Sequence, residues 1–436
     1  MMKAKNLIKR VTIGILAVVL STSVVWADDN PGLIQRAKDA CKNATYDIPT
    51  VTNDIDGWPQ GPAIMCDSAV VMEAESGEVL YNKAMDERRY PASTTKIMTA
   101  LVALEHSNLT DTVTFTAEGL KEAVPGNSYV TPVIQEGETL TMEQCLYAIM
   151  LVSGNEVSTQ VAMQVGGSVE GFVEMMNEKA QEIGCKDTHF VNANGLHDEN
   201  HYTTAHDLAM IAQEAYKNEE FRKIVGSRYY TIPATNKTAE ERVLANHHAL
   251  LGEGDWHYDG CLGGKTGYTD TALNTLVTYF EKDGTVYICV VLHYKGTEVF
   301  TDTVMLAEYT KEFEKLQVSP KKYTLSGGTA VVPKGTTTDA LEIQSTQNED
   351  GNEQETFLFN GYEVGQAVVD TKAYEADKKA EEAQKEEESK EEQSQNNEAQ
   401  SGSFSTFEIA VVVLVGLIGL GLILIVISVI KKKKKK

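Results

Sequence analysis

A helical pattern begins within the segment Tyr90-Pro91-Ala92-Ser93-Thr94-Thr95-Lys96-Ile97-Met98-Thr99-Ala100. The proline is typical of a first helical turn, and the apolar residues that follow recur at helical spacing. Ser93 and Lys96 are three positions apart, so their side chains share one face of that helix. A buried, neutral amine can remove the proton of a neighbouring hydroxyl, and a helix N-terminus favours developing negative charge. Taken in isolation, the segment favours a serine helix cap and a solvated lysine over a catalytic pair.

Strand patterns lie on both sides of this helix. Residues 69–74 and 78–83 predict a hairpin, and residues 273–280 and 285–294 predict another, with Asp283-Gly284 as its turn signal. Helical patterns occupy the middle, around 142–164, 169–184 and 205–216, and a last helix is expected at 299–313. Strands at both ends with helices between them predict an α+β domain whose terminal strands share one sheet.

Two further short motifs carry polar groups suited to chemistry. Ser153-Gly154-Asn155 interrupts an apolar helical pattern with a hydroxyl and an amide, which suit a proton relay and a hydrogen bond to a substrate backbone. Lys265-Thr266-Gly267 opens a late strand, where an ammonium, a hydroxyl and a bare backbone would bind an extended substrate that ends in a carboxylate. Taken separately, these motifs are also compatible with a turn between helices and a glycine-rich turn.

The joint order of the three motifs resembles the signature of the penicillin-recognising serine acyltransferases. The match is closest to the D-alanyl-D-alanine carboxypeptidases, the low-molecular-weight penicillin-binding proteins, and extends over about residues 62–313. It is carried by the segment around Ser93 and by three others: Thr188-His189-Phe190-Val191-Asn192-Ala193-Asn194-Gly195-Leu196, Thr203-Thr204-Ala205-His206-Asp207-Leu208-Ala209 and Gly264-Lys265-Thr266-Gly267-Tyr268-Thr269.

This resemblance implies a penicillin-binding, transpeptidase-like α+β fold and acyl transfer in two steps without a metal or cofactor. Ser93 would be the nucleophile, Lys96 its general base, Ser153 a proton relay and Asn155 the group that orients the substrate. The substrate-binding residues would be Lys265, Thr266, Gly267 and Tyr268, with the backbone N–H groups of Ser93 and Tyr268 as the oxyanion hole. The implied substrate is the D-Ala-D-Ala end of a peptidoglycan stem peptide, and β-lactams are the implied inhibitors.

The sequence departs from the family pattern at several positions. Leu273 follows Ala272 where a glycine is usual, and Glu156 follows the S-G-N motif where an aspartate is common. No arginine follows Arg242, so a second carboxylate-binding arginine is missing, and Lys295 is the one substitute to consider. These departures keep open a catalytically weak or idle cell-wall binding protein on the same fold.

Other enzymes fit less well. A class A β-lactamase needs a glutamate that activates water, and Glu199, the nearest choice, lacks an asparagine four residues on. A zinc peptidase would need clustered ligands, whereas His197, His201 and His206 lie in a loop without a helical H-E-x-x-H pattern. A D,D-endopeptidase or a transfer to an amine would use the same residues and stays open.

The two ends of the chain indicate its location. Residues 1–27 are typical of a secretory signal peptide, and the uncharged run at 409–430 is long enough for a transmembrane helix, which we expect at 408–430. The lysines at 431–436 put the C-terminus in the cytoplasm. We therefore expect a single-pass protein of the cell membrane with its catalytic domain on the extracytoplasmic face.

The rest of the chain divides by composition. We expect a catalytic domain at 28–317, a small β-rich domain at 318–372 and a charged, disordered or helical stalk at 373–407. The net charge of −24 excludes nucleic acid as a partner. The six cysteines show no C-x-x-C spacing, and the sequence does not decide whether they pair.

Overall fold

The structure is a computed structural model that describes residues 30–296, 298–318 and 323–401. The described residues form two compact units. The first holds the described residues within 1–320, 327–345 and 355–367, and the second those within 321–326, 346–354 and 368–436. The predicted signal peptide and the predicted membrane span both lie outside the described residues. No helix within the described part of the chain is long and apolar enough to cross a membrane.

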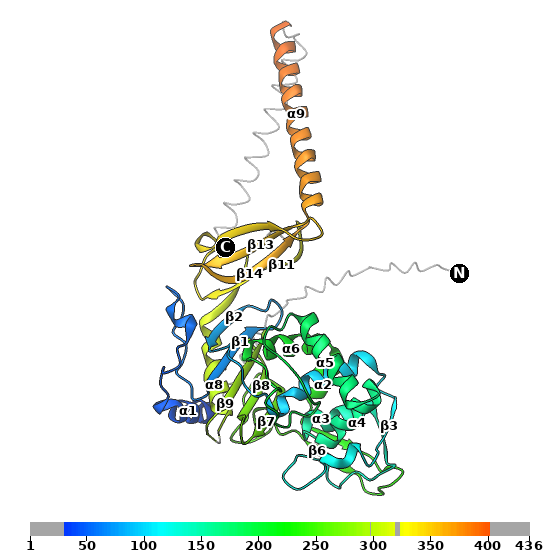
Figure 1. Cartoon of the computed structure of the whole chain (residues 1–436). Coiled ribbons are helices and arrows are strands. Elements are labelled where there is room, and N and C mark those ends of the chain that lie inside the picture. The colour runs from blue at the N-terminus through cyan, green and yellow to red at the C-terminus, as the bar shows by residue number, and fades with distance from the viewer. Residues whose placement is uncertain (1–29, 297, 319–322, 402–436) are drawn as a thin grey trace, which may run out of the picture. The chain divides into compact units, whose positions relative to one another are not determined.

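Runs of strands and runs of helices follow one another along the chain (Figure 1). The helices are α1 (Pro31–Ala40), α2 (Lys96–His106), α3 (Met142–Leu151), α4 (Asn155–Gly166), α5 (Val169–Ile183), α6 (Ala205–Lys217), α7 (Glu219–Val225), α8 (Phe300–Tyr309) and α9 (Thr371–Ser401). The strands of the main sheet are β1 (Ser68–Glu73), β2 (Val79–Lys83), β7 (Cys261–Thr269), β8 (Leu273–Lys282) and β9 (Thr285–Tyr294). The other strands are β3 (Thr112–Thr114), β4 (Thr139–Thr141), β5 (Tyr229–Ile232), β6 (Arg242–Ala245), β10 (Phe313–Gln317), β11 (Thr324–Pro333), β12 (Glu342–Gln347), β13 (Glu353–Phe359) and β14 (Tyr362–Val369).

The main sheet joins the two ends of the catalytic region, as the sequence predicts. Its strand order is β2-β1-β9-β8-β7, with antiparallel pairing of β1 to β9 from Ser68↔Leu292 to Glu73↔Tyr287. The first hairpin, β1 and β2, therefore pairs through β1 with β9 of the last hairpin, and β7 forms an edge of the sheet. Segments more than 200 residues apart in the sequence thus lie side by side in one layer.

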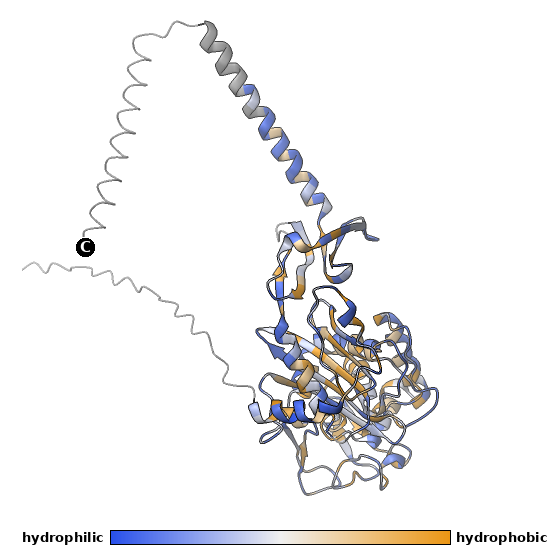
Figure 2. Ribbon diagram, turned by 90° about the vertical axis from the view of Figure 1, so that its left-hand side faces the viewer, coloured by the Kyte–Doolittle hydropathy of each residue, from blue (hydrophilic) through white to orange (hydrophobic). Residues whose placement is uncertain are grey.

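Side chains of β1 alternate between two hydrophobic clusters, one on each face of the sheet. Val70 and Met72 join the cluster that contains α2 to α7, whereas Ala69 and Val71 join the cluster that contains α1 and α8. This period of two is what a strand covered on both faces requires. The ribbons of the central strands are accordingly coloured as hydrophobic in Figure 2.

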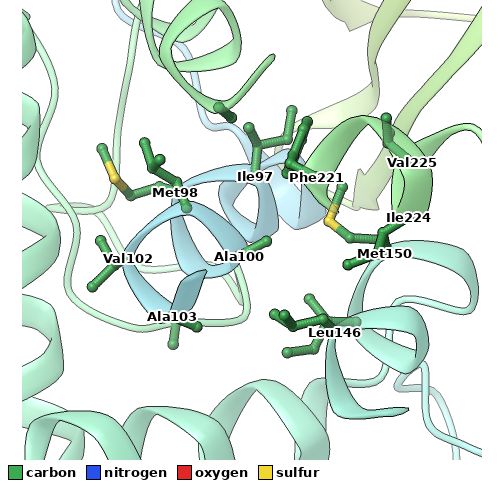
Figure 3. Packing of buried hydrophobic residues seen from close by; sticks show 14 of the residues in the cluster. Ile97, Met98, Ala100, Val102, Ala103, Leu146, Met150, Phe221, Ile224 and Val225 are labelled. Atoms are coloured by element: carbon green, nitrogen blue, oxygen red, sulfur yellow. The ribbon is translucent and has the colours of Figure 1, made fainter. Parts of the chain in front are cut away.

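Helix α2 lies inside the larger cluster, which fixes the turn that precedes it. Its residues Ile97, Met98 and Ala100 are 1% exposed or less. Side chains of α3 and α7 pack around them (Figure 3). A helix that packs against apolar neighbours in this way belongs to the core of the domain. Large-to-small changes there cost about 2–5 kcal/mol, so the start of α2 is held firmly.

Two helix predictions need correction at their ends. The pattern at 142–164 is two helices, α3 and α4, separated by the turn 152–154 in which Ser153 has a φ of +61°. The helix expected at 299–313 ends at Tyr309, a short 3-10 turn follows, and Phe313 opens β10. The pairing of Phe313–Gln317 with Pro333–Thr329 of β11 causes this change, and such a distant partner leaves no local signal.

The region after α8 forms a second five-stranded sheet of order β10-β11-β14-β13-β12. In the second unit, the start of α9 is capped by Asp370, whose Oδ1 accepts the N–H of Ala373 at 3.0 Å. Tyr374 of α9 packs edge-to-face on Tyr323 of the same unit. All six cysteines lie in the described residues as free thiols.

Candidate active site

Ser93 lies in a strained 3-10 turn, Ala92–Thr95, directly before α2. Ala92 has a φ of +50°, an uncommon conformation for a residue with a Cβ atom. Thr95 Oγ1 donates a hydrogen bond to the Ala92 carbonyl oxygen at 2.8 Å, and Thr94 Oγ1 donates to that of Pro91 at 2.6 Å. Ser93 forms no side-chain cap and is partly exposed, so the cap reading is wrong and the hydroxyl is accessible.

Lys96 is fully buried, which contradicts the reading of a solvated lysine. Its Nζ lies 3.0 Å from Ser93 Oγ, donates to Asn155 Oδ1 at 2.7 Å, and donates to the Asn194 carbonyl oxygen. Burial, and then the charge of Lys265, hold the pKa of Lys96 well below its ordinary value of 10.5. A neutral amine has two N–H donors, which the two carbonyl oxygens use. Its lone pair then faces Ser93 Oγ, as a general base requires.

Ser153 and Lys265 form the other half of the site. Lys265 is 1% exposed, and its Nζ donates to Ser153 Oγ at 3.1 Å and to the Thr266 carbonyl oxygen at 2.7 Å. Burial lowers the pKa of Lys265 to about 7. The Ser153 hydroxyl therefore lies beside the Lys265 amine, whose pKa is perturbed, and shortly before α4, which begins at Asn155. This is a suitable place for a group that passes a proton.

Strand β7 brings Lys265 and Thr266 into the site from the edge of the sheet. A Cβ atom on Gly267 would stand 2.8 Å from the backbone nitrogen of Ser93, so only glycine lets the strand approach the nucleophile this closely. The side chain of Tyr268 is 59% exposed, and its phenol donates to Asp270 Oδ1 at 3.1 Å. The phenol is thus occupied by Asp270, and the predicted oxyanion hole of the Ser93 and Tyr268 backbone N–H groups stays a prediction.

The structure thus brings the predicted catalytic residues together. Hydrogen bonds link Lys96 to Ser93 and Asn155, and Lys265 to Ser153. Lys295, the substitute considered for a missing arginine, instead pairs with Asp67 at 3.1 Å and is 60% exposed at its side chain.

Glu156 is a functional neighbour that sequence reasoning treated only as a departure. It is fully buried, its Oε1 accepts the Val130 N–H at 2.8 Å, and its Oε2 has no hydrogen-bond partner. Burial raises its pKa, while the charge of Lys96 acts in the opposite direction. A buried carboxyl beside Lys96 moderates the loss of basicity that burial imposes on that amine.

The segment 192–201 supplies three groups to which no role was assigned from the sequence. The Asn194 carbonyl oxygen binds Lys96, and Gly195 (φ +82°) lies against the Ala92 carbonyl oxygen. His201 Nδ1 accepts the Val191 N–H at 3.1 Å, so its Nε2 carries the proton and donates to Thr95 Oγ1 at 2.8 Å. The N-A-N-G run was the available signal, because an Asn-Gly step marks a turn with positive φ.

The three clustered histidines have separate structural contacts. Burial lowers the pKa of His201 to about 3, so it is a neutral support for the nucleophile turn. His197 packs edge-to-face on Tyr90, whereas His206 pairs with Asp86 at 3.3 Å and lies in the first turn of α6, not in a loop as predicted. Among the described residues, no group of three metal-ligating side chains converges.

Comparison with known proteins finds similarity to enzymes of one family. A sequence model of the D-alanyl-D-alanine carboxypeptidase family matches residues 57–296. The D-alanyl-D-alanine carboxypeptidase DacF of Bacillus subtilis is 37% identical over 229 residues, which are 51% of this chain and 56% of that protein. The D-alanyl-D-alanine carboxypeptidase of a Streptomyces species is 33% identical over 53% of this chain and 81% of its own.

Solved structures of D-alanyl-D-alanine carboxypeptidases and DD-transpeptidases are also similar to this chain. The Streptomyces K15 DD-transpeptidase superimposes with a TM-score of 0.54 and 30% identity, over 58% of this chain and 98% of its own. A D-alanyl-D-alanine carboxypeptidase from Mycobacterium tuberculosis covers 61% of this chain and 97% of its own at a TM-score of 0.54 and 27% identity. With a family match over more than half of its length, and with Ser93, Lys96 and Lys265 gathered at one site, the chain belongs to the D-alanyl-D-alanine carboxypeptidase family.

Proposed function

We propose that the protein is a serine-type D-Ala-D-Ala carboxypeptidase that removes the terminal D-alanine from peptidoglycan stem pentapeptides. The observation that carries this proposal is the buried Lys96 Nζ at 3.0 Å from Ser93 Oγ. An unpaired serine hydroxyl is a weak nucleophile, and a neutral amine at this distance activates it.

In the first step, the Ser93 proton moves to Lys96 Nζ while Oγ attacks the carbonyl carbon between the two D-alanines. The negative charge on the carbonyl oxygen is stabilised by the backbone N–H groups of Ser93 and Tyr268. Thr266 and the ammonium of Lys265 bind the terminal carboxylate. Collapse of the tetrahedral intermediate breaks the C–N bond, and Ser153 passes to the departing D-alanine amine the proton that Lys96 took from Ser93, so that Lys96 is again a neutral amine.

In the second step, water attacks the Ser93 ester. Lys96 takes the proton of the water, the ester bond breaks, and Ser93 regains its hydroxyl hydrogen. A β-lactam ring presents a strained amide and a carboxylate to the same groups. It acylates Ser93 and leaves slowly, so penicillin inhibits the enzyme.

The location of the protein follows from its ends. Residues 1–27 direct export, and the apolar run at 409–430 followed by six lysines anchors the chain with its C-terminus in the cytoplasm. The catalytic domain then faces the peptidoglycan. Protease protection in membrane vesicles of known orientation tests this topology, and protection of the catalytic domain on the cytoplasmic side would contradict it.

The activity is tested with the full chain in detergent and a fluorescent penicillin. We expect the label on the peptide that contains Ser93, its loss in Ser93→Ala, and its retention in Ser107→Ala, a matched change at the other end of α2. D-alanine release from a synthetic pentapeptide then identifies the carboxypeptidase reaction. A folded protein without label would indicate the idle wall-binding alternative, and preferential formation of a peptide product with an added amine would indicate a transpeptidase.

A further inference from the structure

The hydroxyl of Thr95 connects the nucleophile turn to the imidazole of His201. Thr95 Oγ1 donates its one hydrogen to the Ala92 carbonyl oxygen at 2.8 Å, so toward His201 it can only accept. It accepts from His201 Nε2, also at 2.8 Å, because His201 Nδ1 is occupied by the Val191 N–H at 3.1 Å. Both side chains are buried. Two hydrogen bonds in series therefore end on the Ala92 carbonyl oxygen.

This carbonyl belongs to the same peptide unit as the Ser93 N–H. The unit is trans and planar, so its C=O and N–H point in opposite directions and rotate together. The Ala92 oxygen lies against Gly195, where an added Cβ atom would overlap it. The Ser93 nitrogen lies beside β7, since a Cβ atom on Gly267 would stand 2.8 Å from it. A group that holds the Ala92 carbonyl in place therefore also sets the direction of the Ser93 N–H.

The Ser93 N–H is one of the two donors assigned above to the negatively charged oxygen of the tetrahedral intermediate. We propose that His201 and Thr95 are positioning residues that aim and polarise this N–H for that oxygen. The assignment rests on the proposed function, in which Ser93 attacks an acyl carbonyl. A hydrogen bond to a peptide oxygen polarises the N–H of the same unit, and bonds in a chain strengthen one another. A donor that is fixed in advance stabilises developing charge without reorganising during the reaction.

Two neighbouring hydroxyl groups hold a different peptide unit. Thr94 Oγ1 and Thr275 Oγ1 both donate to the Pro91 carbonyl oxygen, at 2.6 and 2.8 Å. That carbonyl precedes the peptide unit of the Ser93 N–H by one residue, so these bonds fix the entry to the turn. The hydroxyl of Thr95, by contrast, acts directly on the unit that carries the proposed oxyanion donor.

Two changes at His201 separate its two hydrogen bonds. His201→Asn keeps an acceptor near the position of Nδ1 and loses the donor to Thr95, whereas His201→Gln places an amide nitrogen near the position of Nε2 and keeps that donor. We expect acylation by benzylpenicillin to be about 10- to 100-fold slower in His201→Asn and in Thr95→Val, and near normal in His201→Gln and Thr95→Ser. Combining His201→Asn with Thr95→Val should slow acylation no further than Thr95→Val alone, because both changes break one chain.

A pair of ligands separates this role from general damage to the site. A peptide boronic acid, with boron in place of the scissile carbonyl carbon, forms a tetrahedral adduct on Ser93 with one oxygen at the oxyanion position. Its Kd should rise by about 10- to 100-fold in Thr95→Val and in His201→Asn. The reduced-amide analogue of the substrate has no carbonyl oxygen, and its Ki should change by less than about twofold, since only the tetrahedral state uses the Ser93 N–H.

Thr310→Val is the matched control. Thr310 Oγ1 donates to the Ala307 carbonyl oxygen at 2.7 Å, so it is a buried threonine that also bonds three residues back, directly after α8. This variant should lose stability in urea without a change in acylation or in boronate affinity. If Thr95→Val does not fold, His201→Asn and His201→Gln provide the same comparison.

Three results would overturn the assignment: normal boronate affinity in folded His201→Asn, equal impairment of His201→Gln and His201→Asn, or equal loss of affinity for the boronic acid and the reduced amide. Failure of the proposed function would instead appear in the unchanged protein, as absence of both D-alanine release and acylation by penicillin.

Discussion

The carbonyl oxygen of Ala92 occupies the space in which a Cβ atom on Gly195 would lie. The residue before the nucleophile is thus in direct contact with the loop that also supplies the Asn194 carbonyl oxygen to Lys96. The shape of the nucleophile turn depends on a residue about a hundred positions away in the sequence. This relationship gives the first prediction.

Gly195→Ala should slow acylation of Ser93 by penicillin at least tenfold and destabilise the fold by about 1–3 kcal/mol. The added methyl group displaces Ala92, and the φ of +82° adds backbone strain. Acylation rates and urea unfolding measure the two effects. Gly167→Ala is the control, since Gly167 has a φ of +74° with open space around it, and it should lose stability without losing acylation. Equal behaviour of the two variants would show that the contact with Ala92 is unimportant.

The pH dependence of kcat/KM should be bell-shaped for a free-acid substrate. On the acidic side, activity falls as Lys96 gains a proton, which its depressed pKa confines to pH values well below 10.5. On the alkaline side, activity falls as Lys265, with a pKa of about 7 in the free enzyme, loses the charge that binds the carboxylate. Steady-state kinetics across pH 5–10 check this profile.

Lys265→Arg should remove the alkaline fall, because a guanidinium stays charged. A carboxamide substrate should lack that fall in the unchanged enzyme, since it has no charge to bind. An activity of the unchanged enzyme on the free acid that keeps rising to pH 10 would be inconsistent with this role for Lys265.

Breaking the buried ion pair between Glu138 and Arg242 should cost about 3–5 kcal/mol of stability. Both side chains are fully buried, and the guanidinium donates to the two carboxylate oxygens at 2.8 and 3.1 Å. Glu138→Gln leaves Arg242 charged without a counter-charge, and urea unfolding measures the loss. The exposed pair of Arg228 and Glu253 is the comparison, and Glu253→Gln there should cost less than about 1 kcal/mol. Similar costs for the two variants would contradict the role of burial.

Leu273 should be strained by its backbone conformation. It has a φ of +56° as the first residue of β8, the position where the family pattern has a glycine. Leu273→Gly and Leu273→Ala both remove the side chain, but only glycine removes the strain. We expect the glycine variant to be more stable than the alanine variant by about 1 kcal/mol in thermal or urea unfolding. An alanine variant of equal or greater stability would show that the turn is relaxed.

The sequence was sufficient for the parts of the fold that local patterns determine. The hairpin at 273–294, with its Asp-Gly turn, and the helix after Ser93 are formed where periodicity and turn residues predicted them. Family motifs also identified residues as distant as Ser93, Ser153 and Lys265, which meet only because β7 lies beside the nucleophile turn.

What the sequence did not reveal depends on contacts between distant segments. The hairpin of β5 and β6 was missed, since short strands around a polar loop have weak periodicity. The burial of Glu156 results from packing, and no composition rule separates it from exposed glutamates. The end of α8 was misplaced because Phe313 finds its partner in β11.

The edge position of β7 has a consequence for the solubility of the protein. An unpaired strand edge that must stay open to a peptide substrate is also open to a strand of any other chain, and nothing can cover it permanently without closing the site. Gly263, Gly264 and Gly267 weaken the tendency of this strand to pair. Lys265, buried with its charge beside the edge, makes a second apolar strand a poor neighbour. We therefore expect the residues proposed to recognise the substrate to oppose self-association as well.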